Sequence, residues 1–483
     1  MVERVGTIGR ESLSHQPEWV IERLQQQALS LAVAQYHLQQ QQEKLEAQRQ
    51  QVEALEAELE QQRRSQKRQA APFRRNSDKR QTNPQRPGRK PGHPGQWRHP
   101  PPASAHDEHI EVPLEHCPHC EHPLDGSQQE ALEQTIVEIP VVTPRVIRLR
   151  TYRNHCEQCQ CRVRSHHPLQ VSTAGGAAST QLGPQAVGVG TYLNKQLGLP
   201  LRQSCEVMEQ LTGVSVSPGG LSQAMRRAAE RLHPCYDNLL EQLRQSEVLY
   251  SDETSWWVAG DSYYLWVLTN PKGTYYRIVP SRCQQAAKDL MGETFEGVLV
   301  SDCLNIYDEL TPHQHKCYAH HLRAISQALE TPGAEHSSYL RNLQVLLYCA
   351  MLLKHNMKAL SESTIVTVRR WLEARADALL SQPRADPDTS QGRQEENIRN
   401  RLSKQRDHLF TFLDHAAVEA TNNAAERQLR PAVITRKRSC GNKTPTGARS
   451  WEVLASLAAT AKQQGTSFID LVAEAISLDP PVQ

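Results

Sequence analysis

The sequence predicts a multidomain α/β protein whose core is interrupted by a long helical segment. Four runs rich in apolar, β-branched and aromatic residues are typical of strands, at 248–252, 262–270, 274–281 and 297–302. A helical pattern at 284–295 separates the third run from the fourth. The order strand, strand, strand, helix, strand is that of the ribonuclease-H-like fold. Helical periodicity with almost no strand signal follows at 303–420, which predicts an all-helical insertion between two parts of this core, 246–302 and 421–483.

The N-terminal part, 1–62, contains a leucine repeat. One apolar position recurs every seven residues, as Leu24, Leu31, Leu38, Leu45, Val52 and Leu59. The repeat contains no Pro or Gly and predicts a long helix, and a two-stranded coiled coil that makes the protein a homodimer or higher oligomer is the favoured interpretation. The alternative is a single amphipathic helix packed on its own protein.

A basic linker is predicted at 63–105, because Pro and Gly recur there and exclude a regular element. The net charge of the chain is only +2, yet the segment 63–98 contains twelve Lys and Arg against one acidic residue, Asp78. This block is a candidate contact for nucleic-acid phosphates, with predicted contacts at Arg74, Arg75, Arg89 and Lys90. The alternative interpretation is a solvated linker.

A zinc-ribbon-like module is predicted at 106–170. It contains two CxxC pairs, formed by Cys117, Cys120, Cys156 and Cys159. Two strand-like runs between the pairs, 135–142 and 145–152, predict a hairpin that returns the second pair beside the first. Four thiolates in a tetrahedral shell suit a structural Zn²⁺, with Cys161 or His155 as possible replacements for one ligand. The alternative is four unrelated buried cysteines.

The segment 171–245 is predicted to be helical. Two helical patterns within 201–232 flank a break from Gly213 to Pro218. A helix-turn-helix that binds DNA and an ordinary helical hairpin are equally compatible with this pattern. The second helix offers Gln223, Arg226 and Arg227 as its only good DNA contacts.

Three carboxylates are the candidate catalytic and metal-binding residues. Asp252 and Asp302 each close a short apolar strand run, and Glu426 follows a predicted helix cap at Thr421 or Asn422. The two aspartates are expected at the ends of neighbouring strands, facing one another. Together the three could hold two Mg²⁺ or Mn²⁺ ions, which would activate a water or 3′-hydroxyl and stabilise the leaving oxygen of a phosphodiester. Glu253 is the competing carboxylate, but strand alternation predicts that it points the other way.

Basic residues after Glu426 are candidate phosphate ligands, namely Arg427, Arg430, Arg436, Lys437 and Arg438. The alternative is a solvated helix face. A further motif comprises Cys317, His320 and Arg323. Because no second ligand pair lies nearby in the sequence, packing or the positioning of a DNA end is favoured over metal binding.

The chain resembles the transposases of the insertion-sequence 66 family, which belong to the DDE recombinase group. The resemblance is carried by GRKPGHPG (88–95), the paired CxxC module, DETSW (252–256), LWVLTN (265–270), Asp302 with Tyr307, the CxxHxxR motif at 317–323, and NNAAERQLRP with the RK at 436–437. These motifs follow one another in this order along nearly the whole chain.

The resemblance implies a transposase that acts on the ends of its own element, with double-stranded terminal inverted repeats and target DNA as its partners. It implies that Asp252, Asp302 and Glu426 are the catalytic triad, that Trp256 stacks on DNA, and that small accessory proteins assist. A metal-dependent nuclease without strand transfer and a catalytically silent DNA-binding descendant are the alternatives. The longest apolar run, Leu343–Leu353, is too short to span a bilayer, so a cytoplasmic, nucleoid-associated protein without membrane contact is expected.

Overall fold

The computed structural model describes residues 99–125, 132–172, 180–292, 295–308, 310–383 and 385–477. The predicted coiled coil at 1–62 and almost all of the basic linker lie outside these residues. The chain comprises two compact units, Met1–Ile136 and Val137–Gln483. The only regular element described in the first unit is a short 3-10 helix, η3 (Ala103–Ala105).

The hairpin predicted between the two CxxC pairs is wrong. Residues 135–152 form no strand in the structure, and their apolar side chains are exposed, including Val141 (92%) and Val146 (95%). The strands lie further along, where β1 (Arg153–His155) pairs antiparallel with β2 (Arg162–Arg164) around the second CxxC pair. An alternating apolar run forms a strand only where a partner strand and a core accept it, and this segment meets neither.

The second unit is built on a five-stranded mixed sheet. Its strands are β3 (Val248–Val258), β4 (Asp261–Asn270), β5 (Gly273–Val279), β6 (Val298–Ser301) and β7 (Gln314–Lys316). Their order in the sheet is β5-β4-β3-β6-β7. The first three strands in sequence pair antiparallel, whereas β3 with β6 and β6 with β7 pair parallel. The prediction that the strands carrying Asp252 and Asp302 are neighbours is therefore confirmed.

Local sequence explains most of these strands. β3 and β4 are joined through Ala259 (φ 55°) and Gly260 (φ 98°), and two residues with positive φ form the hairpin turn whose twist matches the strands. β6 reads Val-Leu-Val-Ser and is buried throughout, as expected for a strand between two others. β7 was not predicted, because its three residues, Gln314, His315 and Lys316, are polar and yet fully buried.

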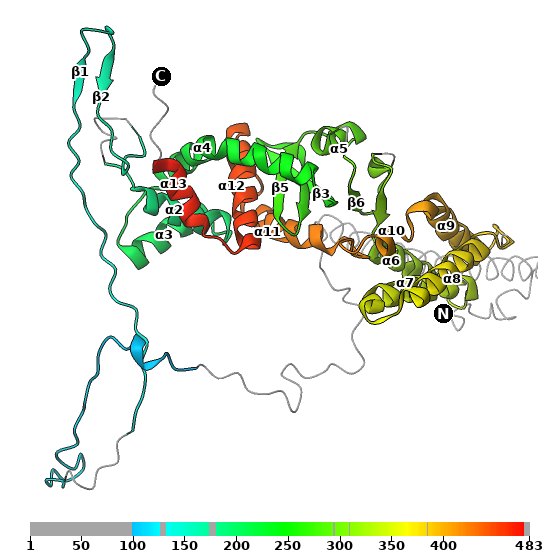
Figure 1. The fold of residues 1–483 in the computed structure, drawn as a ribbon, viewed down its shortest axis with the longest axis horizontal. Helices are drawn as coiled ribbons and strands as arrows, with labels where there is room; N and C mark the ends of the chain where they lie inside the picture. The colour runs from blue at the N-terminus through cyan, green and yellow to red at the C-terminus, as the bar shows by residue number, and fades with distance from the viewer. Residues whose placement is uncertain are drawn as a thin grey trace, which may run out of the picture. The chain divides into compact units, whose positions relative to one another are not determined.

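Side chains on the two faces of the sheet enter two different cores. On β3, Val248 and Tyr250 pack in one core, and Leu249 packs in the other. The first core includes residues of α11 (Asn423–Ser439), and the second includes α4 (Pro218–Arg244) and α5 (Gln284–Met291). α12 (Pro445–Gln464) contributes to both, since Trp451 belongs to the first core and Leu454 to the second. Figure 1 shows β3, β5 and β6 between α12 and the helices α6 to α10.

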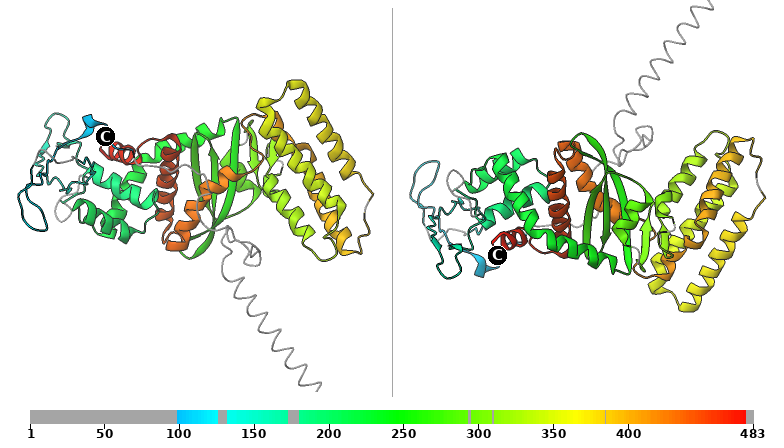
Figure 2. Two further views of the ribbon diagram at one scale, coloured as in Figure 1. Left: turned by 90° about the horizontal axis from the view of Figure 1, so that it is seen from below. Right: turned by 90° about the horizontal axis from the view of Figure 1, so that it is seen from above.

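The predicted insertion is helical and begins after β7. Its helices are α6 (Tyr318–Leu329), α7 (Ser338–Asn356), α8 (Glu362–Leu380), α9 (Ser390–Lys404) and α10 (Thr411–Asp414), with the 3-10 turns η7 (Met357–Ala359) and η8 (Arg406–His408). Both views of Figure 2 show these helices, coloured from yellow-green to orange, together beyond one edge of the sheet. The expectation that 303–420 holds no strand is wrong, since β7 and the 3-10 turn η6 (Asn305–Tyr307) precede α6.

The helices predicted around the break at 213–218 are confirmed. α2 (Pro184–Lys195) and α3 (Leu201–Thr212) precede α4, and α13 (Phe468–Ser477) packs against α2. Gly213 ends α3 in a left-handed conformation (φ 68°), and the Ser217 hydroxyl accepts a hydrogen bond from the Gly220 N–H at the start of α4. α4 continues far beyond the predicted helix, and Tyr236 and Leu243 anchor its second half in the core. Among the described residues, no helix is long and apolar enough to cross a membrane.

Candidate functional site

Asp252 lies within β3, at the point where the strand leaves its parallel neighbour. The pairing of β3 with β6 ends at Tyr250 and Val300, while β3 continues for eight residues in its hairpin with β4. Asp252 is therefore not at the end of its strand, as the sequence predicted, but just past the end of the parallel pairing. Burial raises the pKa of Asp252 well above its usual value, and the charges of three nearby carboxylates raise it further, those of Glu253, Asp302 and Glu426.

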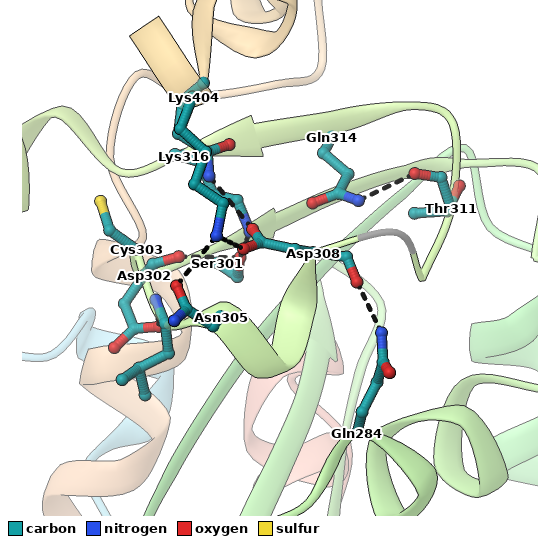
Figure 3. Close-up of polar contacts among 12 residues, drawn as sticks. Gln284, Ser301, Asp302, Cys303, Asn305, Asp308, Thr311, Gln314, Lys316 and Lys404 are labelled. Atoms are coloured by element: carbon teal, nitrogen blue, oxygen red, sulfur yellow. Dashed lines mark hydrogen bonds and ion pairs between the residues drawn. The ribbon is translucent and has the colours of Figure 1, made fainter. Parts of the chain in front are cut away.

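Asp302 follows β6 and begins a loop that polar contacts hold in place. One carboxylate oxygen of Asp302 accepts a hydrogen bond from the Leu304 N–H (3.0 Å). At the other end of the loop, Asp308 forms ion pairs with Lys316 of β7 (3.4 Å) and Lys404 of α9 (2.7 Å), as Figure 3 shows. Burial alone would raise the pKa of Asp308, but hydrogen bonds and the charges of the two lysines lower it. The helical insertion thus helps to hold the loop that carries Asp302.

Glu426 lies in the first turn of α11, whose apolar face packs on β3 and β4. Ala425, Leu429 and Ala432 are buried in the first core. The chain that leads into α11 is also tied to β3, because the Tyr250 hydroxyl donates to the Ala417 carbonyl (3.3 Å) and accepts from the Glu419 N–H (3.0 Å). The structure therefore brings Glu426 to the same face of the sheet as Asp252.

Glu253 points away from Asp252, as strand alternation predicted. Its side chain is 1% exposed, pairs with the Arg282 guanidinium (2.6 Å) and accepts a hydrogen bond from the Tyr307 hydroxyl. Burial raises the pKa of Glu253 despite these partners. The sequence did not predict this network, in which the exposed Arg282 and the buried Tyr307 both bind Glu253. Its only signal was Tyr307, which belongs to one of the motifs shared with the transposases.

The donor set of Asp252, Asp302 and Glu426 is chemically suited to Mg²⁺ or Mn²⁺. All three residues offer carboxylate oxygens, the ligands these ions prefer. The raised pKa of Asp252 reflects first its burial and then the charges of the neighbouring carboxylates, which a divalent cation would neutralise. In the described part of the chain, no three His, Cys, Asp or Glu side chains are already grouped at metal-binding spacing.

Arg436 is not a DNA contact, and this prediction is wrong. The residue is 6% exposed, and its guanidinium donates to the hydroxyls of Thr254 (3.0 Å) and Ser255 (2.8 Å) and to the Ser255 carbonyl. Arg436 therefore fastens α11 to β3. The predicted phosphate ligands Arg427, Arg430 and Lys437 are exposed on α11, and Arg323 is exposed on α6.

Trp256 cannot stack on DNA in this structure, so the role implied by the resemblance is corrected. Its ring is 1% exposed, its Nε1 donates to the Asn442 side-chain oxygen (2.8 Å), and the ring packs on Trp451 with centroids 4.8 Å apart. The exposed aromatic is the next residue, Trp257 (38%). Alternation along β3 makes the two rings face opposite sides.

The two CxxC pairs adopt similar local turns. The Cys117 N–H donates to the His122 carbonyl, and the Cys156 N–H donates in the same way to the Cys161 carbonyl. The residue after each pair, Glu121 (φ 58°) and Gln160 (φ 56°), is left-handed. Backbone N–H groups, first that of His119 for Cys117 and that of Cys159 for Cys156, lower the pKa of these two thiols.

Lower thiol pKa values favour the thiolate that binds Zn²⁺. The pairs lie in different compact units, so a single Zn²⁺ shared by all four cysteines stays a prediction. The predicted DNA contacts Arg74, Arg75, Arg89 and Lys90 lie outside the described residues.

The first residue of the motif at 317–323, Cys317, packs inside the protein. Cys317 is 0% exposed, and its sulfur accepts a hydrogen bond from the Asn422 N–H (3.1 Å). The sulfur is thus already engaged inside the protein. His320 is half-buried, and burial lowers its pKa.

Comparisons with known proteins agree with the shared motifs. A family model described as the IS66 family of transposases matches residues 180–450, more than half of the chain and a region that includes all three carboxylates. Two curated proteins of Sinorhizobium fredii (strain NBRC 101917 / NGR234), both named as uncharacterized, are each 24% identical to the chain. The match to y4qI covers 58% of this chain and 56% of that protein, and the match to y4jD covers 69% of each. On the strength of the family match, this chain belongs to the IS66 family of transposases.

Proposed function

We propose that the protein is a DNA transposase of a bacterial insertion sequence, and that Asp252, Asp302 and Glu426 carry out metal-dependent cleavage and strand transfer at the ends of the element. The observation that carries this proposal is the placement of the aspartates two residues beyond the paired Tyr250 and Val300. Glu426 approaches from a helix packed on the same sheet. The strand order and directions support a ribonuclease-H-like core.

Mg²⁺ or Mn²⁺ held by the three carboxylates would activate a water or a 3′-hydroxyl and stabilise the leaving oxygen of the phosphodiester. The protein's own contribution is to hold the carboxylates in place. Lys316 and Lys404 hold the Asp302 loop through Asp308, and α11 packs on the strand that carries Asp252. Arg282 and Tyr307 engage Glu253, which keeps this fourth carboxylate out of the triad.

The DNA partners of this proposal are double-stranded terminal repeats and target DNA. The exposed residues Arg323, Arg427, Arg430 and Lys437 are proposed to bind phosphates around the site. A structural Zn²⁺ on the CxxC pairs, self-association through the N-terminal leucine repeat, and help from small accessory proteins belong to the same proposal.

The experiment that tests this function is cleavage of a labelled fragment that contains the element's end, with Mg²⁺ or Mn²⁺, by wild type and by Glu426→Gln. Metal-dependent nicking by wild type alone, followed by joining to a target duplex, is expected. Nicking without joining would favour the alternative of a nuclease. Binding without cleavage by either protein, even with the accessory proteins added, would leave a catalytically silent DNA-binding protein and reject the proposal.

A further inference from the structure

We propose that Asn422, through its contacts with Cys317, is the positioning residue that holds the three carboxylates of the triad in register. This inference rests on the proposed function. Asn422 precedes α11 and is 0% exposed. Its side-chain Nδ2 donates to the carbonyl of Ser251 (2.8 Å), the residue immediately before Asp252.

The backbone of Asn422 makes two further contacts. Its carbonyl accepts a hydrogen bond from the N–H of Glu426 (3.2 Å), which starts the helix that carries this carboxylate. Its N–H donates to the sulfur of Cys317 (3.1 Å). One residue is thus bonded to the strand of Asp252, to Glu426 itself, and to the junction between β7 and α6.

Cys317 extends the same chain of hydrogen bonds to the third carboxylate. Its N–H donates to the carbonyl of Ser301 (2.9 Å), the residue immediately before Asp302. Ser251, Ser301 and Cys317 are all 1% exposed or less. The bonds therefore run from Ser301 through Cys317 and Asn422 to Ser251 and Glu426, and all of these residues except Glu426 are buried.

The chemistry of Asn422 suits positioning better than packing. Its Oδ1 is buried without a hydrogen-bond partner among the described residues. That unpaired oxygen costs free energy, and an apolar side chain of similar shape would avoid this cost only by removing the donor to the Ser251 carbonyl. An amide N–H₂ can donate to the Ser251 carbonyl, whereas a carboxylate cannot and would add a fourth negative charge beside the triad.

The test compares Asn422→Leu, which keeps the shape and removes the donor, with Asn423→Leu at the exposed neighbour in the same helix turn. With Asn422→Leu, cleavage of a labelled element end should fall by about 100-fold. The Mg²⁺ concentration for half-maximal rate should rise by about tenfold. Binding of the same DNA without metal should stay within about twofold of wild type. Asn423→Leu should match wild type in all three measurements.

The sulfur contact is tested by Cys317→Ser, which keeps an acceptor, beside Cys317→Ala, which removes it. Only the alanine variant should share the raised Mg²⁺ requirement. A lower unfolding temperature with unchanged Mg²⁺ dependence, measured well below that temperature, would show that Asn422 only stabilises the fold and would overturn the proposal.

A measurement that needs no activity separates this inference from the proposed function. Amide hydrogen exchange at Cys317 and Glu426 should be faster in Asn422→Leu than in Asn423→Leu. Equal exchange in the two variants would reject the positioning role, even if wild type cleaves DNA. Faster exchange with no cleavage by wild type would reject the proposed function and leave Asn422 a purely structural link, which also overturns the inference.

Discussion

Asp252 of β3 and Asp302, the residue after β6, occupy equivalent positions beyond the parallel pairing of these two strands. Tyr250 pairs with Val300, and each aspartate lies two residues beyond its member of this pair. Side chains two residues apart on a strand point to the same face, so Asp252 extends the row that Tyr250 begins, whereas Asp302 follows Val300 directly after the end of β6. Tyr250 and Val300 are buried in the same core, which also includes residues of the helix that carries Glu426.

The first prediction concerns Asp302. Asp302→Asn should lower cleavage by about a thousandfold or more, because an amide is a poor ligand for the metal ion that the carboxylate would hold. Binding of element-end DNA without metal should be nearly unchanged, as measured by titration of a labelled fragment. Asp261→Asn, at the exposed start of β4, is the control. A loss of binding as large as the loss of cleavage would contradict the assigned role.

The second prediction separates two adjacent basic residues on α11. Arg436→Ala should lower the free energy of unfolding by about 1–3 kcal/mol, because the groups on β3 that the buried guanidinium binds lose their partner. Lys437→Ala should change stability by less than about 0.5 kcal/mol and should weaken DNA binding. DNA binding by the Lys437→Ala variant should also depend less on salt, so that the slope of the logarithm of the binding constant against the logarithm of the salt concentration falls in magnitude by about one. Denaturant unfolding and salt titrations of binding measure both effects, and the reverse pattern would refute this division of roles.

The third prediction is a pH dependence of stability that arises from Glu452 of α12. This residue is 4% exposed, and burial raises the pKa of its carboxyl from 4.5 to about 7, although Arg277 opposes the shift. A raised carboxyl pKa means that the folded state holds its proton longer than the unfolded state does. The stabilising contribution is therefore complete below pH 4.5 and is lost as the pH rises through 7, by about 3 kcal/mol.

Glu452→Gln should remove this part of the pH dependence and should be more stable than wild type at pH 8. Unfolding free energies measured between pH 5 and 8 provide the check, with Glu474→Gln, exposed on α13, as the control. If the unfolding free energy of Glu452→Gln changes with pH as steeply as that of wild type, another group causes the pH dependence.

The fourth prediction concerns the CxxC pairs. Cys117→Ser should reduce the zinc that co-purifies with the protein, because Zn²⁺ needs the thiolates that the local backbone favours. Cys440→Ser, at an exposed cysteine outside the pairs, should retain the wild-type zinc content. Metal analysis of both purified variants measures this difference. Equal zinc contents in the two variants would show that Cys117 is not a zinc ligand.

Much of the sheet could be predicted from local patterns. The apolar runs located the start of β3 and both ends of β4, β5 and β6 to within two residues, because these stretches are apolar enough to signal their own burial, but they missed the last six residues of β3. β7 could not be predicted, since its three polar residues are buried only by the partners the fold supplies. Lys316 is an example, because it reaches Asp308 across the sheet edge. The prediction for the apolar run at 135–152 was wrong for the opposite reason. Its pattern is typical of a strand, but no other element covers its apolar side chains.

By itself the sequence predicted the order of the core elements, the helical character of the insertion and three candidate carboxylates, because these predictions depend on periodicity and on motifs along the chain. Only the tertiary structure decided which of Trp256 and Trp257 is exposed, that the Arg436 guanidinium is bound inside the protein, and that Asn422 and Cys317 hydrogen-bond to each other and to the residues before Asp252 and Asp302. These properties depend mainly on contacts between residues 100 to 190 positions apart, and no local pattern encodes which distant atom a side chain will reach.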